Sequence, residues 1–374
     1  MKSLLSFAAV VACCPASAIS CGHAGDGGQS SSGLGLHLCV DTDRFSDPLT
    51  LQQLVRNELG KAVPRGTNNL IYVRDEARLS VVSSGAVWSV LARQSATLIA
   101  DEGAVNLISD VSTPGSPSES YRHDVHLRFK GFAGYGLSIE SGQFKLGKAG
   151  SMRLGVQGLS VKRLINRDLN GFASYDALRR SYGLYAESEY ANDRLHYPYQ
   201  APFGGAGFGL LLNAQLRWQF TPATDAELTV EDLGLLRWAR LPQETLTISS
   251  ETSRLDGDGY LVYRPLAQGR NHQDGLTTTV SSTWTLAVRH TLNSQFAVDA
   301  RLRRMTGFSD WLPYAGIQYK FGDGWLLRSG WQFHERSLNL SAAVGAWSLR
   351  IAGDRMDGHA HARSAMLSWQ ASLK

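Results

Sequence analysis

The sequence of 374 residues has little charge and few cysteines, and it lacks long apolar runs. A helix that crosses a membrane needs about 20 consecutive apolar residues, and no stretch after the N-terminal segment comes close to that length. Only 19% of the residues are charged, and the mean hydropathy is −0.18. These values exclude a helical membrane protein. They allow a transmembrane β-barrel, because alternation of apolar and polar side chains keeps the mean hydropathy of a barrel moderate.

Recognisable catalytic and cofactor motifs are also missing. The glycine-rich segments 147–151 and 203–209 lack the Gly-Lys-Ser/Thr arrangement of a phosphate-binding loop. His359 and His361 alternate as metal ligands can, but no third ligand accompanies them. Serine and histidine occur without the spacing of a nucleophile and its base, and there is no dense basic patch. The sequence therefore predicts no enzyme, no cofactor, no bound metal and no nucleic-acid partner.

The first 18 residues have the pattern of a secretory signal peptide. Lys2 provides the positive start, Leu4–Ala12 the apolar core, and Ala16-Ser17-Ala18 a small-residue cleavage site. We therefore expect export and a mature chain that begins near Ile19. Lipoprotein processing at Cys13 is an alternative, because the four residues that end there are similar to a lipobox.

Two of the four cysteines, Cys21 and Cys39, would remain after removal of the signal peptide. Exported proteins commonly form disulfides, so a Cys21–Cys39 bond is the first expectation. Two unpaired thiols, or a lipid attached to Cys21, are the alternatives.

Residues 19–66 form the next predicted unit. The segment 19–45 is rich in glycine and serine, and 46–64 predicts a short helix. Ser46 or Asp47 can cap that helix, Pro48 fits its first turn, and Gly60 fits the position after its end. We expect this segment to lie in the periplasm or to plug a barrel.

Regular alternation of apolar and polar residues fills the rest of the chain. In 276–289, Val280, Trp284 and Leu286 share one parity while threonine and serine hold the other. Successive side chains of a strand point to opposite faces, so such a segment predicts a strand that is apolar on one side only. The same pattern recurs in 123–130, 208–220, 296–303, 312–321, 325–333 and 365–373.

Short glycine-containing links join many of these segments, and tryptophan and tyrosine lie near their ends, as in aromatic girdles. In these features residues 67–374 resemble Gram-negative outer-membrane β-barrel proteins as a class. The fold prediction is an all-β, antiparallel, up-and-down transmembrane barrel of about 16 strands, within a range of about 12 to 18. The polar segments 191–207 and 265–275 are expected to be long outer loops.

The polar face of the predicted strands carries the candidate site. It would line the lumen, and its cations outnumber its carboxylates. The predicted lumen and solute-binding residues are Arg128, Lys130, Arg217, Arg289, Asp299, Arg301, Arg303, Lys320, Arg328 and Arg350. An excess of positive charge between low-dielectric walls attracts anions.

The sequence therefore predicts an outer-membrane channel or exporter for hydrophilic molecules, anionic solutes or an acidic polysaccharide among them. Its expected partners are membrane lipid, lipopolysaccharide, the outer-membrane assembly machinery and the transported solute. Two other hypotheses stay open at this point. One is a structural or secretion-accessory barrel plugged by its N-terminal segment, and the other is an outer-membrane hydrolase.

Overall fold

The computed structural model describes residues 34–83, 85–113, 119–197, 199, 205–250, 253–255, 261–263, 265–322 and 324–373. The predicted signal peptide and Cys21 lie outside these ranges. No helix among the described residues is long and apolar enough to cross a membrane.

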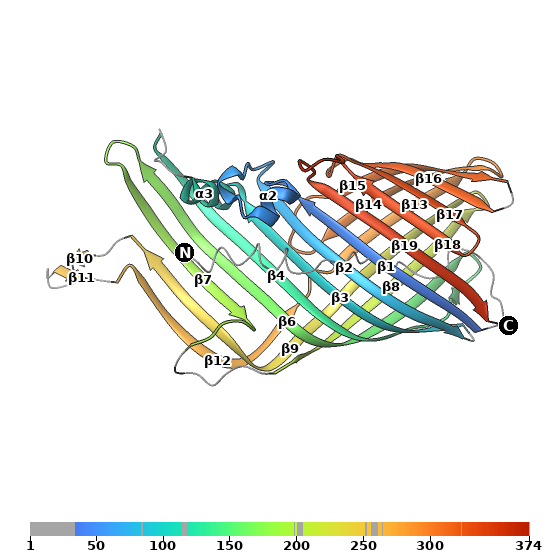
Figure 1. Ribbon diagram of the computed structural model, residues 1–374, viewed down its shortest axis with the longest axis horizontal. Coiled ribbons are helices and arrows are strands. Elements are labelled where there is room, and N and C mark those ends of the chain that lie inside the picture. The colour runs from blue at the N-terminus through green and yellow to red at the C-terminus, as the bar shows by residue number, and fades with distance from the viewer. Residues whose placement is uncertain are drawn as a thin grey trace.

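The described strands form a closed antiparallel barrel with fourteen strands in its wall, rather than the predicted number of about 16. Each of these strands pairs with its neighbours in the ring, and β19 returns to pair with β1. Figure 1 shows the wall with both of these strands in front. In ring order the strands are β1 (Leu34–Ser46), β2 (Asn68–Ser83), β3 (Ala86–Asp101), β4 (Tyr121–Glu140), β6 (Gly150–Asp176), β8 (Gly207–Thr221), β9 (Thr224–Ser249), β13 (Thr283–Thr291), β14 (Phe296–Met305), β15 (Leu312–Phe321), β16 (Trp325–Gln332), β17 (Ser337–Val344), β18 (Trp347–Gly353) and β19 (Ala362–Leu373).

Two long strands of the wall, β6 and β9, each pair with two different strands along one edge. The lower half of β6 pairs with β8, while its upper half pairs with β7 (Ser181–Asn192). Strand β9 pairs with β13 along its lower half and with β12 (Ala267–Thr279) along its upper half. Strands β6, β7, β9 and β12 therefore extend the sheet beyond the rest of the wall, at the left of Figure 1.

Three short strands complete the described β-structure. Strand β5 (Phe144–Leu146) pairs with the start of β6, and β10 (Ser253–Leu255) pairs with β11 (Leu261–Tyr263). The segment 265–275 was expected to be a loop, but most of it lies in β12. The other predicted loop falls between the end of β7 and the start of β8, and its residues 198 and 200–204 lie outside the described ranges.

The predicted alternation is confirmed along most of the wall. Trp284, Leu286 and Val288 are exposed on the outer face, whereas Thr283 is buried on the other parity. Val280 departs from the prediction, because the strand breaks after Thr279 and the side chain of Val280 packs with an internal apolar cluster. Exposed apolar side chains form an outer belt around the barrel, which is the surface that a membrane-spanning barrel presents to lipid.

The wall begins at Leu34, so the predicted boundary at residue 67 is wrong. Residues 34–46 alternate as β1, with His37, Cys39 and Asp41 buried while Leu38 is exposed. This pattern was obscured by the polar residues that face inward. Neither a plug nor a periplasmic unit can therefore include residues 34–46.

Three helical segments lie at the end of the barrel opposite the start of β1 and the end of β19 (Figure 1). They are α2 (Leu51–Arg56), η2 (Leu59–Lys61) and α3 (Glu102–Ser112). Helix α2 begins one turn later than the sequence suggested. Its N-cap is Thr50, which forms a reciprocal capping box with Gln53, and its C-cap is Asn57 in the left-handed conformation. Helix α3, capped by Asp101, was not predicted.

Candidate functional site

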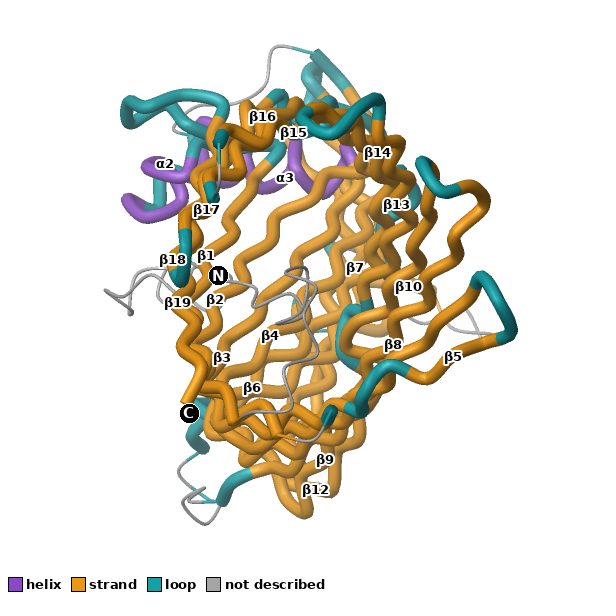
Figure 2. Tube along the Cα trace, turned by 90° about the vertical axis from the view of Figure 1, so that its right-hand side faces the viewer, coloured by secondary structure: helices purple, strands orange, loops and turns teal. Residues whose placement is uncertain are grey.

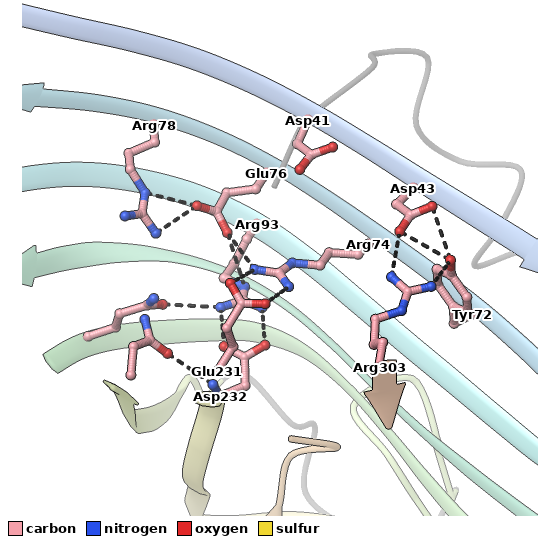
Figure 3. A network of polar contacts seen from close by, with 12 residues as sticks. Asp41, Asp43, Tyr72, Arg74, Glu76, Arg78, Arg93, Glu231, Asp232 and Arg303 are labelled. Carbon is pink, nitrogen blue, oxygen red and sulfur yellow. Dashed lines mark hydrogen bonds and ion pairs between the residues drawn. The ribbon is translucent and has the colours of Figure 1, made fainter. Parts of the chain in front are cut away.

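The lumen is crossed by side chains that connect opposite walls (Figure 3). Arg303 on β14 donates 2.7 Å to the hydroxyl of Tyr72 on β2. The same guanidinium lies 2.6 Å from Glu335 and 3.2 Å from Asp43. Its positive charge is therefore matched by two carboxylates. Because these residues come from β1, β2, β14 and the β16–β17 turn, they close the lumen from both sides.

A second group of ion pairs joins β2 and β3 to β9. Arg93 forms two hydrogen bonds of 2.7 Å with the carboxylate of Asp232, and the side chain of Arg93 is fully buried. Arg74 lies 3.0 Å from Glu231. Asp232 has a φ angle of 62° in a bulge of β9, which lets consecutive carboxylates point into the lumen. Figure 3 shows both pairs meeting between the walls.

Glu76 lies at the centre of a third group. Its carboxylate is 2.8 Å from Arg78, 3.8 Å from Arg74 and 3.9 Å from Arg93. Arg78 in turn lies 2.7 Å from Glu140 on β4. A buried carboxylate is tolerated only when charge and hydrogen bonds compensate for its lost hydration. These contacts provide that compensation and fix the interior of the wall.

Apolar residues close the loop end of the lumen above the charges. Phe45, Leu70, Met305 and Phe308 form one buried cluster with Leu312. The turn between β14 and β15 reaches β3, where a Cβ on Gly307 would lie 3.1 Å from Ile99. Gly307 has a φ of +94°, so glycine suits both the turn and the close approach.

Titratable groups in the β16–β17 turn lie against this closure. His334 lies 3.3 Å from the carboxylate of Asp47. Burial lowers the pKa of His334, but its hydrogen bond to Asp47 and the charge of that carboxylate outweigh burial, so the pKa is raised above its ordinary value. Burial raises the pKa of the neighbouring Glu335, against the opposing charge of Arg303.

The structure places most of the predicted lumen residues in pairs rather than along an open path. Arg128 pairs with Asp168, Arg217 with Asp225, Arg301 with Asp299, Arg303 with Asp43 and Glu335, and Arg350 with Asp41. Arg328 donates to Gln318, and Lys130 donates to Thr279. Arg289 lies opposite Asp225 and Asp299 in the strand register. Lys320 is exposed at the short-turn end of β15.

Sequence reasoning missed the residues that form the centre of the network. These are Asp41, Asp43, Tyr72, Arg74, Glu76, Arg78, Arg93, Asp232 and Glu335, and all of them except Glu335 are labelled in Figure 3. The sequence feature that could have indicated them is the run of alternating charges in Arg74, Glu76 and Arg78 of β2. Three charged residues on one parity of a strand indicate a polar inner face.

An apolar cavity of about 370 Å³ lies against the opposite, outer face of the wall. Ile71, Leu98 and Leu127 line it, and they share the parity of the exposed residues Leu79, Val90 and Leu137 farther along β2, β3 and β4. The helical segments roof the cavity. Their contributions are Leu54, Asn57, Glu58, Leu59, Gly60, Val105, Ile108, Val111 and Ser112.

Aliphatic and aromatic side chains dominate the cavity. Phe129, Ile165 and Tyr190 form its floor with the residues of β2 and β3. Arg167 also lines it and lies 5.1 Å above the ring of Tyr190 in a cation–π contact. The cavity thus offers an apolar interior with one oriented cation, and it is separated from the charged lumen by the barrel wall.

Cys39 is buried and disulfide-bonded. Its expected partner, Cys21, lies outside the described residues, so the Cys21–Cys39 pairing stays a prediction. The described residues contain no group of three or more side chains that could hold a metal ion.

No protein-family model matches the chain, and no curated protein sequence matches it. Solved structures do. The toluene transporter TodX of Pseudomonas putida is 12% identical over 92% of this chain and 91% of its own, with a TM-score of 0.42. The toluene transporter TbuX of Ralstonia pickettii is 10% identical over 92% and 90%, with a TM-score of 0.42. A FadL homologue of Pseudomonas aeruginosa is 12% identical over 91% and 89%, with a TM-score of 0.38.

The predicted passage of hydrophilic or anionic solutes or polysaccharide is wrong. The lumen cations that suggested it are matched by carboxylates inside the barrel: Arg301 pairs with Asp299, Arg303 with Asp43 and Glu335, and Arg350 with Asp41. The interior of this barrel explains why the cations on the lumen face suggested the wrong class of solute. The sequence shows their excess over carboxylates on the same strands, but Asp41, Asp43 and Glu335 reach them from elsewhere in the ring.

Proposed function

We propose that this protein is an outer-membrane barrel that takes up small apolar molecules, and that the cavity beneath α2, η2 and α3 is their binding site. The observation that supports this proposal is the cavity itself, whose floor is formed by Ile71, Leu98, Leu127 and Phe129. We further propose that the chain acts in transport rather than catalysis. Its expected setting is the bacterial outer membrane, where it would contact membrane lipid and be inserted by the assembly machinery.

The size and chemistry of the cavity suit a single aromatic ring. An apolar cavity of roughly 150 Å³ lined by Leu, Ile and Phe is large enough to hold benzene. The cavity here is about 370 Å³ and has a similar lining. Burial of the apolar surface of such a solute provides the binding free energy, and the ring of Tyr190 offers an edge or face for aromatic contact.

The position of the cavity provides a route that avoids the lumen. A solute that moved through the lumen would have to pass the apolar closure and the ion pairs around Arg303 and Arg93. The cavity instead lies on the lipid-facing side of the wall. A bound apolar molecule can therefore enter the bilayer without passing the buried charges of the lumen, which an apolar molecule cannot solvate.

Filling the cavity tests this proposal. Ala100 is buried in the cavity wall on β3, so Ala100→Phe places a ring in the space. Initial uptake of radiolabelled toluene by cells that express the barrel should fall roughly tenfold, equivalent to ~1.4 kcal/mol of lost binding free energy. Ile108→Phe, which fills the cavity from α3, should have the same direction of effect.

Ala92→Phe is the matched control, because Ala92 lies on the same strand and parity but is exposed on the outer face. Uptake is compared at equal amounts of folded barrel, measured as the heat-modifiable band on unboiled gels. Equal toluene uptake by wild type and both filled variants would rule out the cavity as the binding site.

A further inference from the structure

A groove lies on the outer face of the wall, on the other side of α2 from the apolar cavity. It encloses about 1010 Å³ between α2, the β18–β19 loop and the outer faces of β1, β2, β17, β18 and β19. Figure 2 shows α2 outside the wall beside β18. The groove is therefore at the loop end of the lipid-facing surface.

The lower part of the groove is apolar and continuous with the lipid-facing belt. Leu338, Leu340 and Ile351 line it, and each is about two-fifths exposed. Val55 of α2 and Met356 of the loop add two more exposed apolar side chains. This surface can hold alkyl chains along the strands.

The upper part of the groove is basic. Its lining includes four arginines, Arg44, Arg56, Arg355 and Arg363, against a single carboxylate, Asp357. Arg363 donates to the backbone carbonyls of Met356 and Asp357, which are uncharged acceptors. When the amide of Gln52 is turned so that its oxygen faces the guanidinium, Arg56 donates to that oxygen over 2.8 Å, and this acceptor is also uncharged. Among the described residues neither guanidinium forms an ion pair, so neutral acceptors orient its charge.

Arg44 differs, because it lies 3.1 Å from the carboxylate of Asp75. Thr42 on β1 and Gln94 on β3 lie on the same outer face and also donate to Asp75. Polar groups are expensive on a lipid-facing surface unless a polar neighbour covers them. The patch therefore marks the level at which polar headgroups meet the wall.

We propose that this groove binds lipid A, the phosphorylated and multiply acylated glycolipid of the outer leaflet. Its phosphates would contact Arg56, Arg355 and Arg363, and its acyl chains would lie on Leu338, Leu340 and Ile351. Guanidinium groups bind phosphate by paired, charge-assisted hydrogen bonds. The proposal rests on the outer-membrane location given under Proposed function, but it does not depend on toluene binding.

Native mass spectrometry of the full-length barrel in detergent tests the proposal, with bisphosphorylated lipid A, its monophosphorylated form and phosphatidylethanolamine as probes. Each arginine at an anionic lipid surface strengthens binding roughly fivefold, so Arg355→Gln/Arg363→Gln should bind lipid A roughly 25-fold more weakly. Arg56→Gln/Arg355→Gln should show a similar loss, which guards against a local effect of losing Arg363 on the loop.

Arg179→Gln/Arg194→Gln is the control pair, because both arginines are exposed and lie away from the groove. Wild type and control should prefer the bisphosphorylated form. Equal retention of all three lipids by wild type, or unchanged lipid A binding by both groove variants, would overturn the proposal. Toluene uptake is measured on the same variants, so a failure of the lipid site is distinguished from a failure of the apolar cavity.

Discussion

Arg303 and Tyr72 are hydrogen-bonded over 2.7 Å although they lie on opposite sides of the ring of described strands. From β2 through β3, β4, β6, β8, β9 and β13 to β14 is seven steps, and seven steps also lead back through β1 and β19 to β15 and then β14. The contact therefore holds two walls together across the lumen. Both side chains also form hydrogen bonds with Asp43 and with Glu335, so the contact is difficult to open one bond at a time.

Removal of the cation should break this join. Arg303→Met leaves Asp43 and Glu335 without their shared partner, and loss of one member of a buried ion pair costs about 3–5 kcal/mol. We expect the free energy of unfolding in urea to fall by that amount and the conductance in planar bilayers to rise. Lys320→Met, which removes an exposed cation from the neighbouring strand, is the control. A variant as stable and as non-conducting as the control would show that the join is dispensable.

Arg93 and Asp232 should behave as a coupled pair. Arg93→Met alone leaves a buried carboxylate, and it should cost about 3–5 kcal/mol of the unfolding free energy. Asp232→Asn keeps a residue that tolerates the positive φ at this bulge, but it removes the negative charge. The double variant should therefore be more stable than the sum of the single losses predicts, by about 1–3 kcal/mol. Strict additivity in the double-mutant cycle would contradict the pairing.

The His334–Asp47 contact should make stability depend on pH. The folded-state pKa of His334 is raised, mainly by Asp47 against the effect of burial. A raised histidine pKa contributes stability that is complete below the unfolded value of about 6.5 and is lost as pH rises through the folded value. The difference in unfolding temperature between wild type and His334→Gln should therefore shrink as pH rises from 6 to 9.

His361 provides an internal contrast for that measurement. Burial lowers its pKa, so the folded protein disfavours its charged form, and its contribution increases with pH. The difference between wild type and His334→Gln does not contain the effect of His361, because both proteins keep that residue. A difference that stayed constant over the pH range would disprove the role of the His334–Asp47 pair.

The capping box of α2 should control the roof of the apolar cavity. Thr50 accepts from the backbone of Gln53 at 3.2 Å, and Gln53 accepts from the backbone of Thr50 at 2.9 Å. Thr50→Ala should destabilise the helix by about 1 kcal/mol and speed amide exchange of residues 53–56 roughly fivefold. Thr50→Ser should restore the slow exchange. Exchange that is equal in all three proteins would show that tertiary contacts alone hold α2.

The sequence predicted the barrel class and the orientation of most side chains, because each depends on alternation within a single strand. The wall between Trp284 and Leu373 is the clearest case. Strand β12 was missed because its residues follow no apolar alternation. It is held by backbone pairing with β9 along Gln268–Asp274, in a part of the sheet that extends beyond the other strands.

The candidate site could not be predicted in the same way. The partners of Arg303 lie 260 and 32 residues away in the chain, and only closure of the ring brings them together. The apolar cavity depends on where α2 and α3 settle on the wall. The residues of its floor, such as Leu127 and Phe129, were correctly placed on the outer parity, but in a uniform lipid-facing belt nothing distinguished them.

The unequal strand lengths have a consequence for the bilayer around the protein. Strand β6 has 27 residues, whereas β17 has 8 and β18 has 7. A tilted strand needs about 9–11 residues to cross a hydrocarbon core of ordinary thickness. Lipid beside β17 and β18 must therefore thin to meet the shorter wall, at a cost of a fraction of a kcal/mol for each ångström of mismatch. Insertion and stability should consequently favour short-chain lipids, and neighbouring lipids should be compressed on this side of the barrel alone.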